Sequence, residues 1–243
     1  MLGLADDALI YAQRLGEWLT RAPQIEEDMA LGNIGLDLLG QARALLTHAG
    51  EIEGRGRDED ALAYLRDERE FRNVHLVEQP RGDFAHEMAR LLVFAGNGYE
   101  LWCALQHSSD DVLAGVAGKA VKEVAYHRDH AAQWVVRLGD GTPESHERMQ
   151  EALVAVAPYV AELGEDDEAS VWATERELGV LPSTLVPART EWVARVVEQA
   201  TLELPEQPRW RSRGGRDGIH SETMGHLLAE LQHVHRSHPG AQW

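Results

Sequence analysis

Apolar residues recur every three or four positions along most of the chain, which is the pattern of amphipathic helices. No segment shows the apolar–polar alternation of a half-buried strand. The pattern therefore predicts an all-α fold: long antiparallel helices joined by short loops, which form a bundle with added C-terminal helices. We expect one domain over residues 1–243 and helices over about 6–19, 24–48, 58–77, 83–108, 111–138, 143–163, 168–178, 187–204 and 221–236.

Capping residues set several of these boundaries. Asp6 and Asp7 are candidates for the N-cap of the first helix, because aspartate oxygens accept the free N–H groups of a first turn. Asp83 fits the same role for the fourth helix, and Thr142–Glu144 indicates an N-cap followed by proline at the first helical position. Gly50 is placed to end the second helix.

The helix expected over 111–138 carries one polar line in an apolar surround. Glu123, His127 and His130 are spaced i, i+4 and i+7, which puts them on one helical face. A carboxylate and two imidazoles on one face can hold a metal in a helix bundle. The alternative is a hydrogen-bonded polar seam or a solvent-exposed stripe, and the sequence leaves both open.

Di-iron carboxylate proteins provide a sharper test, because they use one Glu from each of two helices and Glu-x-x-His from each of two others. The chain has one such motif, Glu230–His233, and it lies opposite the apolar stripe of the last helix. Asp-x-x-His occurs at Asp83–His86 and Asp217–His220, near helix starts, where capping accounts for the aspartate. The four-helix ligand pattern is therefore short of at least two imidazoles.

Charge and cysteine content narrow the function classes. The net charge of −18 argues against a general nucleic-acid binder, which needs cations against phosphate. The single cysteine, Cys103, rules out an internal disulfide and fits the reducing cytoplasm. The first residues lack the basic start of a signal peptide, and no stretch is apolar enough to span a membrane. We expect a cytoplasmic protein with no membrane association.

Asp37 stands in an otherwise apolar helix and needs an explanation. A buried carboxylate must be paired or it protonates, and Arg66, Arg69 and Arg72 are available cations. The residue is otherwise a metal ligand or simply exposed. We predict that Asp37→Ala destabilises the chain by leaving a buried cation unpaired.

The segment 210–216, WRSRGGR, is basic within an acidic chain. It fits an acidic partner or the phosphates of a nucleotide-bearing substrate, or it is an ordinary solvated loop. Seven tryptophans are more than a core of this size needs. The seven include Trp192, Trp210 and Trp243, and several of the seven are expected in a subunit interface, where Trp and Arg are enriched.

Long motifs resemble one known family. DLLGQARALLTHAGEIEG, DEDALAYLRDEREFRNVHLVEQP, KEVAYHRDHAAQWVVRLGDGTPESHERMQEAL, GGRDGIHSETMGHLLAELQ and the terminal GAQW look like the C subunits of the bacterial phenylacetyl-CoA 1,2-epoxidase complex. The resemblance runs from the second helix to the last residue. It implies a ferritin-like long four-helix bundle that pairs with a homologous catalytic A-type subunit.

The resemblance also implies where the chemistry lies. The A-type subunit holds the di-iron centre and binds phenylacetyl-CoA, and a reductase subunit with FAD and an iron–sulfur cluster supplies electrons from NADPH. The C subunit is structural, with no catalytic, cofactor or metal residues of its own. Asp37, Glu68, Glu123 and His127 are then the remnant of a metal centre, and the partners include further oxygenase and reductase subunits.

Interfaces and alternatives complete these expectations. We predict interface positions at Trp210, Arg213, Met224 and Leu228, and a homodimer is plausible when the partner is absent. One competing hypothesis is an independent di-iron or di-manganese oxidase with an atypical ligand set, which is Asp37, Glu68, Glu123, His127 and His130. Another is a free-standing acyl-CoA binding protein that uses Arg211, Arg213 and Arg216.

Overall fold

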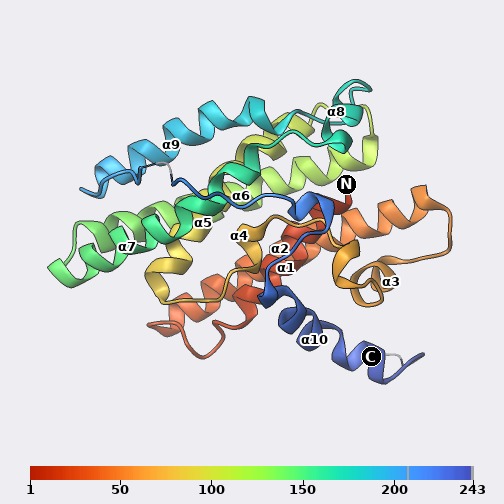
Figure 1. Ribbon diagram of the computed structural model, residues 1–243, viewed down its shortest axis with the longest axis horizontal. Coiled ribbons are helices and arrows are strands. Elements are labelled where there is room, and N and C mark those ends of the chain that lie inside the picture. Colours follow the sequence, from red (N-terminus) through yellow and green to blue (C-terminus); the bar gives the residue numbers. More distant parts are fainter. Residues whose placement is uncertain (207, 242–243) are drawn as a thin grey trace. The chain divides into compact units, whose positions relative to one another are not determined.

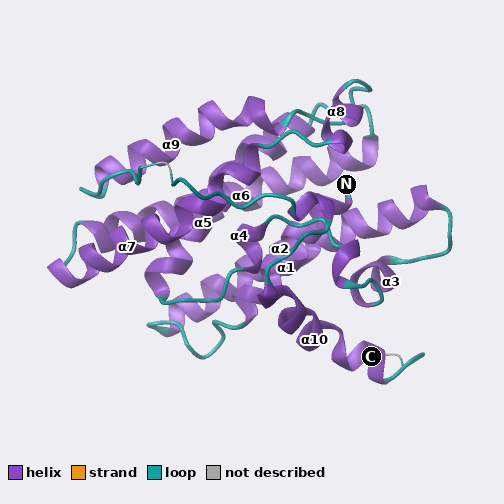
Figure 2. Cartoon of the chain, viewed as in Figure 1, coloured by secondary structure: helices purple, strands orange, loops and turns teal. Residues whose placement is uncertain are grey.

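The computed structural model describes residues 1–206 and 208–241, and every regular element in these ranges is a helix (Figures 1 and 2). The all-α prediction is confirmed, and the helical content fits a ferritin-like bundle. None of the described helices combines the length and the apolarity needed to cross a membrane. The α-helices are α1 (Leu2–Gly16), α2 (Ile25–Glu53), α3 (Glu59–Tyr64), α4 (His75–Glu78), α5 (Phe84–Leu105), α6 (Asp111–Gly139), α7 (Pro143–Val160), α8 (Glu168–Thr174), α9 (Val186–Gln199) and α10 (Glu222–Ser237).

The chain divides into two compact units. The first comprises residues 1–80 with the C-terminal segment from Arg213, and the second comprises residues 81–212. In the first unit α1 packs along α2, and α10 lies against α3 and α4. In the second, α5 packs along α6, and α7 and α9 pack on α5. That residues 1–243 form a single domain stays a prediction.

Several predicted boundaries are confirmed by side-chain caps. Asp83 accepts from the His86 N–H at 3.0 Å, and Asp110 accepts from two N–H groups of the first turn of α6. Thr142 caps α7 with proline as the next residue. The end of α2 was predicted too early, because Gly54, with a φ of +66° that favours glycine, ends it in place of Gly50.

Two predictions about the N-terminal part are wrong for one shared reason. Asp6 and Asp7 do not cap α1; they lie buried inside it. The helix expected over 58–77 is broken into α3, the short 3₁₀ helix η1 (Glu68–Glu70) and α4. The Arg72 and Val74 N–H groups donate to Asp6 and Asp7, each at 2.8 Å, so two backbone donors face α1 and do not continue a helix.

Two glycines of α6 allow a matched test of how this helix packs against Ala200. A methyl group on Gly139 would clash with the Ala200 carbonyl and lie 2.9 Å from the Ala200 Cβ, whereas nothing lies within 4 Å of the same position on Gly115. We therefore expect Gly139→Ala to destabilise by about 1–3 kcal/mol through overpacking. Gly115→Ala should stabilise by about 0.5–1 kcal/mol, since alanine favours a helix interior. Urea unfolding of both variants checks this, and equal effects would contradict the packing of α6 against Ala200.

Candidate functional site

Two adjacent carboxylates on α1 organise the polar interior of the first unit. Asp6 has no exposed surface and forms an ion pair with Arg66, which is 2% exposed. The second Asp6 oxygen lies 3.0 Å from the Arg66 guanidinium and also accepts the Arg72 N–H. Arg66 donates further to the carbonyls of Leu62 and Glu70. Both charges are thus compensated and hydrogen-bonded, as buried ions require.

Asp7 makes the second pair, with Arg216 from the C-terminal segment. The Arg216 guanidinium donates to both Asp7 oxygens, at 2.7 and 3.0 Å, and to the carbonyls of Gly3 and Arg72. Burial raises the pKa of the Asp7 carboxyl, while Arg216 and the Val74 N–H act in the opposite direction. The pair fastens residues more than 200 positions apart in the sequence.

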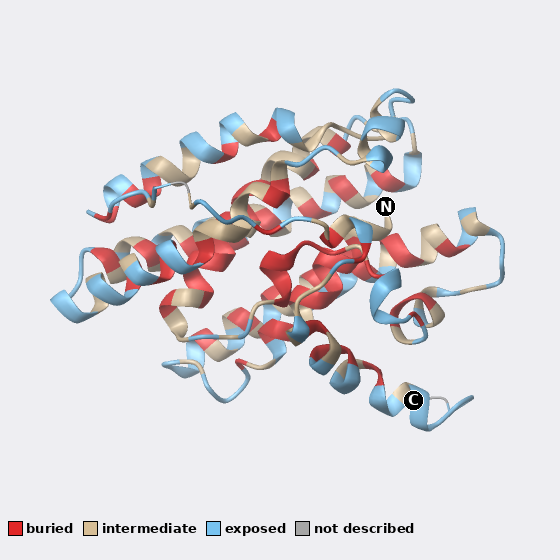
Figure 3. Ribbon diagram, viewed as in Figure 1, coloured by how far each residue is buried: buried red, intermediate tan, exposed pale blue. Residues whose placement is uncertain are grey.

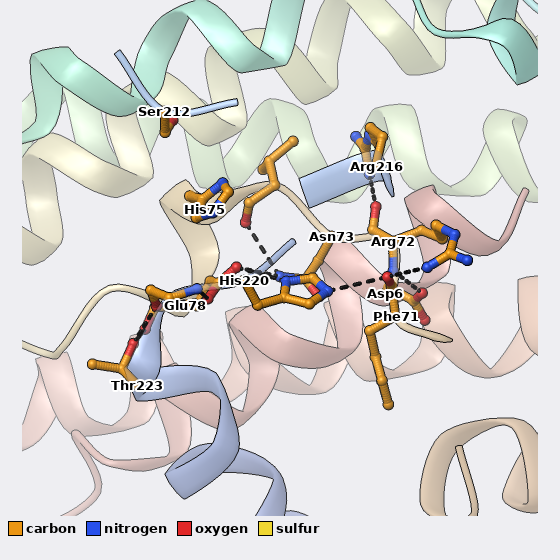
Figure 4. A network of polar contacts seen from close by, with 12 residues as sticks. Asp6, Phe71, Arg72, Asn73, His75, Glu78, Ser212, Arg216, His220 and Thr223 are labelled. Carbon is orange, nitrogen blue, oxygen red and sulfur yellow. Dashed lines mark hydrogen bonds and ion pairs between the residues drawn. The ribbon is translucent and has the colours of Figure 1, made fainter. Parts of the chain in front are cut away.

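Glu78, at the end of α4, is the third buried carboxylate that links segments of the first unit (Figure 4). We call the carboxylates of Asp6, Asp7 and Glu78 the three anchors. Its carboxylate is fully buried and accepts from the His220 Nδ1 at 2.9 Å, the Ser221 N–H at 2.9 Å and the Ser221 hydroxyl at 2.7 Å. The His220 Nε2 lies 3.1 Å from the Phe71 carbonyl oxygen. Both ring nitrogens of His220 therefore face oxygen atoms of the segment 71–78, which fixes the orientation of the ring.

These three anchors have a structural character. Each carboxylate of Asp6, Asp7 and Glu78 is occupied by cations, N–H groups or hydroxyls of the same unit. Carboxylates bound in this way are poor candidates for metal ligands or proton carriers, because a ligand would have to displace a charge-assisted hydrogen bond. The network joins α1, the segment 66–78 and the start of α10 into one body.

Two of the predicted remnant residues, Asp37 and Glu68, belong to the first unit, and Glu123 and His127 lie one turn apart on α6 in the second. Glu123 is half-buried on α6 and lies 2.9 Å from the Lys119 ammonium group, and His127 is buried, with its ring plane at 73° to that of Tyr126. Asp37 is half-buried on α2, and Glu68 is exposed on η1. Within residues 1–206 and 208–241, no three His, Cys, Asp or Glu side chains form a group that could hold a metal ion.

One polar pair on α5 was missed by the sequence reasoning. Glu87 and Arg90 are both buried, at 0% and 3% exposure, and their charged groups lie 3.8 Å apart. Their spacing is that of Glu-x-x-His, with arginine in the place of the histidine. A search for Glu-x-x-[His/Arg] in apolar helices would have found this pair.

A buried arginine also fixes α9 on α5. Arg189 is 4% exposed and donates to the Asn97 side-chain oxygen at 2.9 Å. Burial lowers the Arg189 pKa to about 10. Trp192, one turn further along α9, packs on Gly96, where a Cβ atom would lie 2.9 Å from the indole. Trp192 thus contributes to packing within this unit.

The arginines of the basic segment 210–216 have different surroundings in the structure. Arg216 is held by Asp7, which removes it from the set proposed for an acyl-CoA thioester, while Arg211 and Arg213 are exposed. Trp210 is 61% exposed and meets the Tyr159 ring edge-on. Among the other predicted interface positions, Met224 and Leu228 are buried on the apolar side of α10, whose two sides differ clearly in Figure 3. Trp243 lies outside the described residues, and the interface assignments stay predictions.

Comparison with known proteins supplies the family. The family described as phenylacetic acid catabolic protein matches residues 1–243, so the chain belongs to that family. The chain is also 44% identical to the C subunit of the 1,2-phenylacetyl-CoA epoxidase of Escherichia coli (strain K12). That match covers 100% of this chain and 97% of the relative. The predicted resemblance is confirmed.

Proposed function

We propose that this chain is the structural, non-catalytic subunit of an oxygenase that epoxidises the ring of phenylacetyl-CoA in aerobic phenylacetate degradation. Its role is to support a homologous subunit that carries the di-iron centre. The oxygenase also needs a reductase subunit, with FAD, an iron–sulfur cluster and NADPH, and it works in the cytoplasm. The full-length identity to an epoxidase C subunit supports the choice of complex.

The buried Glu87–Arg90 pair carries the assignment of a structural role. A di-iron bundle places a glutamate and a histidine at this spacing, so that both bind metal. Arginine stays protonated and offers no lone pair to a metal, and its charge compensates the glutamate that would otherwise need a cation. The described carboxylates on α1 and α4 are likewise engaged by Arg66, Arg216 and His220. These residues do not fit a di-iron site, so we assign no catalytic step to this chain.

A bundle without metal still contributes to catalysis by holding its partner. A rigid neighbour fixes the partner's ligand-bearing helices at constant spacing and so preorganises a site to which it supplies no ligand. Rigidity of this kind requires a well-satisfied polar interior, which the anchors at Asp6, Asp7 and Glu78 provide.

Elemental analysis tests this proposal. The purified chain alone should contain no stoichiometric iron or manganese, and a co-purified complex with the homologous subunit should contain about two irons per pair. Epoxidation of phenylacetyl-CoA should require both chains together with the reductase. The competing hypothesis, an independent di-iron or di-manganese oxidase, would be supported by about two metal ions per copy of this chain alone. In that case Glu123 and His127 would be the first ligands to substitute.

A further inference from the structure

Exposed apolar side chains follow one face of α2. Ile25, Met29, Leu36 and Leu39 are 71%, 65%, 66% and 42% exposed. Their spacing of about 3.6 residues puts them in one line along the helix. Leu19, which is 53% exposed, precedes the helix. We call these five side chains the α2 stripe.

The α2 stripe is a continuous surface. A Cβ atom on Gly32 would lie 3.4 Å from the Leu19 Cδ2, so Leu19 lies over the helix between Met29 and Leu36. From Ile25 to Leu39 the helix advances about 21 Å, at about 1.5 Å per residue. An apolar line of this length is enough for the centre of a subunit interface, and a polar rim must complete it.

The charges beside the stripe identify the kind of partner. Between Ile25 and Leu39, α2 carries four carboxylates, of which Glu27 is buried, and no lysine or arginine. Glu26 is exposed, and Asp28 and Asp37 are half-buried beside the stripe. A second copy of this chain would bring the same carboxylates against them, and the whole chain has a charge of −18. A face with this charge fits a different chain, whose apolar helix is bordered by lysine or arginine.

We propose that the α2 stripe is the docking surface for the homologous di-iron subunit, which meets it with an apolar helix face bordered by cations. This inference rests on the proposed function, since it takes the partner from there and adds the face on which that partner binds. Burying large apolar side chains that are otherwise in water provides the affinity, and like charges of the carboxylates disfavour a second copy on this face.

The test compares substitutions at exposed positions. Leu36→Glu puts a charge at the centre of the stripe, and Val154→Glu puts the same charge on α7, where the valine is 55% exposed. Both isolated variants should keep the wild-type helix content and melting temperature. Affinity is measured by titration with the purified homologous di-iron subunit. Leu36→Glu should raise the dissociation constant about 100-fold, as expected for a central contact, while Val154→Glu should leave it unchanged.

A charge reversal tests the choice of partner. Glu26→Lys should weaken the complex several-fold at low salt and have no effect at high salt, because screening removes the attraction between exposed charges. Wild-type binding that survives Leu36→Glu would contradict the docking face and leave the proposed function standing. A wild-type chain that binds no homologous subunit would contradict the proposed function itself. A chain that dimerises through Leu36 and joins the di-iron subunit elsewhere would show that the face belongs to a second copy.

Discussion

Asp6→Ala is expected to lower the free energy of unfolding by about 3–5 kcal/mol. The substitution removes the only carboxylate that the Arg66 guanidinium contacts in the described network, and Arg66 stays 2% exposed. An uncompensated buried charge is among the most costly defects in a fold. The Arg72 N–H also loses its acceptor, which adds the cost of an unsatisfied buried donor. Urea unfolding followed by circular dichroism measures the loss.

Two further variants separate the charge from the loss of a side chain. Arg43→Ala removes an ion pair to Glu59 in which the arginine is 74% exposed, and it should change stability by no more than about 1 kcal/mol. Combining Asp6→Leu with Arg66→Met replaces the buried pair by apolar groups and should recover most of the loss. A small loss in Asp6→Ala, or no recovery in the double variant, would contradict a buried ion pair as the main contribution.

The hydrophobic periodicity was sufficient to predict the long helices. The helices α5 and α7 begin where their caps were expected, and α6 begins at the predicted residue 111, because local sequence decides such boundaries. The prediction of one helix over 58–77 was wrong because the hydrogen bonds that compete with a helix there are not local. The acceptors that hold the Arg72 and Val74 N–H groups, Asp6 and Asp7, lie 66 and 67 residues earlier, and helical periodicity carries no information about them.

The sequence predicted the candidate site less well than the fold. Sequence reasoning expected a buried carboxylate at Asp37, whereas the structure buries Asp6, Asp7 and Glu78. Aspartates near a chain start are explained by capping as readily as by burial, so local pattern favours the wrong role. The cation opposite Asp7 is Arg216, 209 residues away in the sequence. The expectation that a buried carboxylate is paired with arginine was correct in kind, but it applied to other residues.

Glu78→Ala is expected to cost about 3–5 kcal/mol and to loosen the C-terminal segment. The substitution leaves His220, the Ser221 N–H and the Ser221 hydroxyl without their carboxylate, in an environment where Glu78 has no exposed surface. The first turn of α10 begins at Glu222, directly after these donors. Amide hydrogen exchange should therefore accelerate first in α10, while α5 and α6 keep their protection.

Glu78→Gln distinguishes charge from geometry at the same position. The amide oxygen still accepts hydrogen bonds, but the amide N–H₂ group now faces N–H and O–H donors that had bonded to the carboxylate. We therefore expect an intermediate loss of about 1–3 kcal/mol in the free energy of unfolding. If the carboxylate compensates a charged His220, combining Glu78→Gln with His220→Gln should cost less than the sum of the two single changes, because the double variant then leaves no lone charge. Strict additivity would show that Glu78 acts through Ser221 and the start of α10. In either case side chains of α1 and α4 hold the segment from Arg213, which makes α10 part of the first unit.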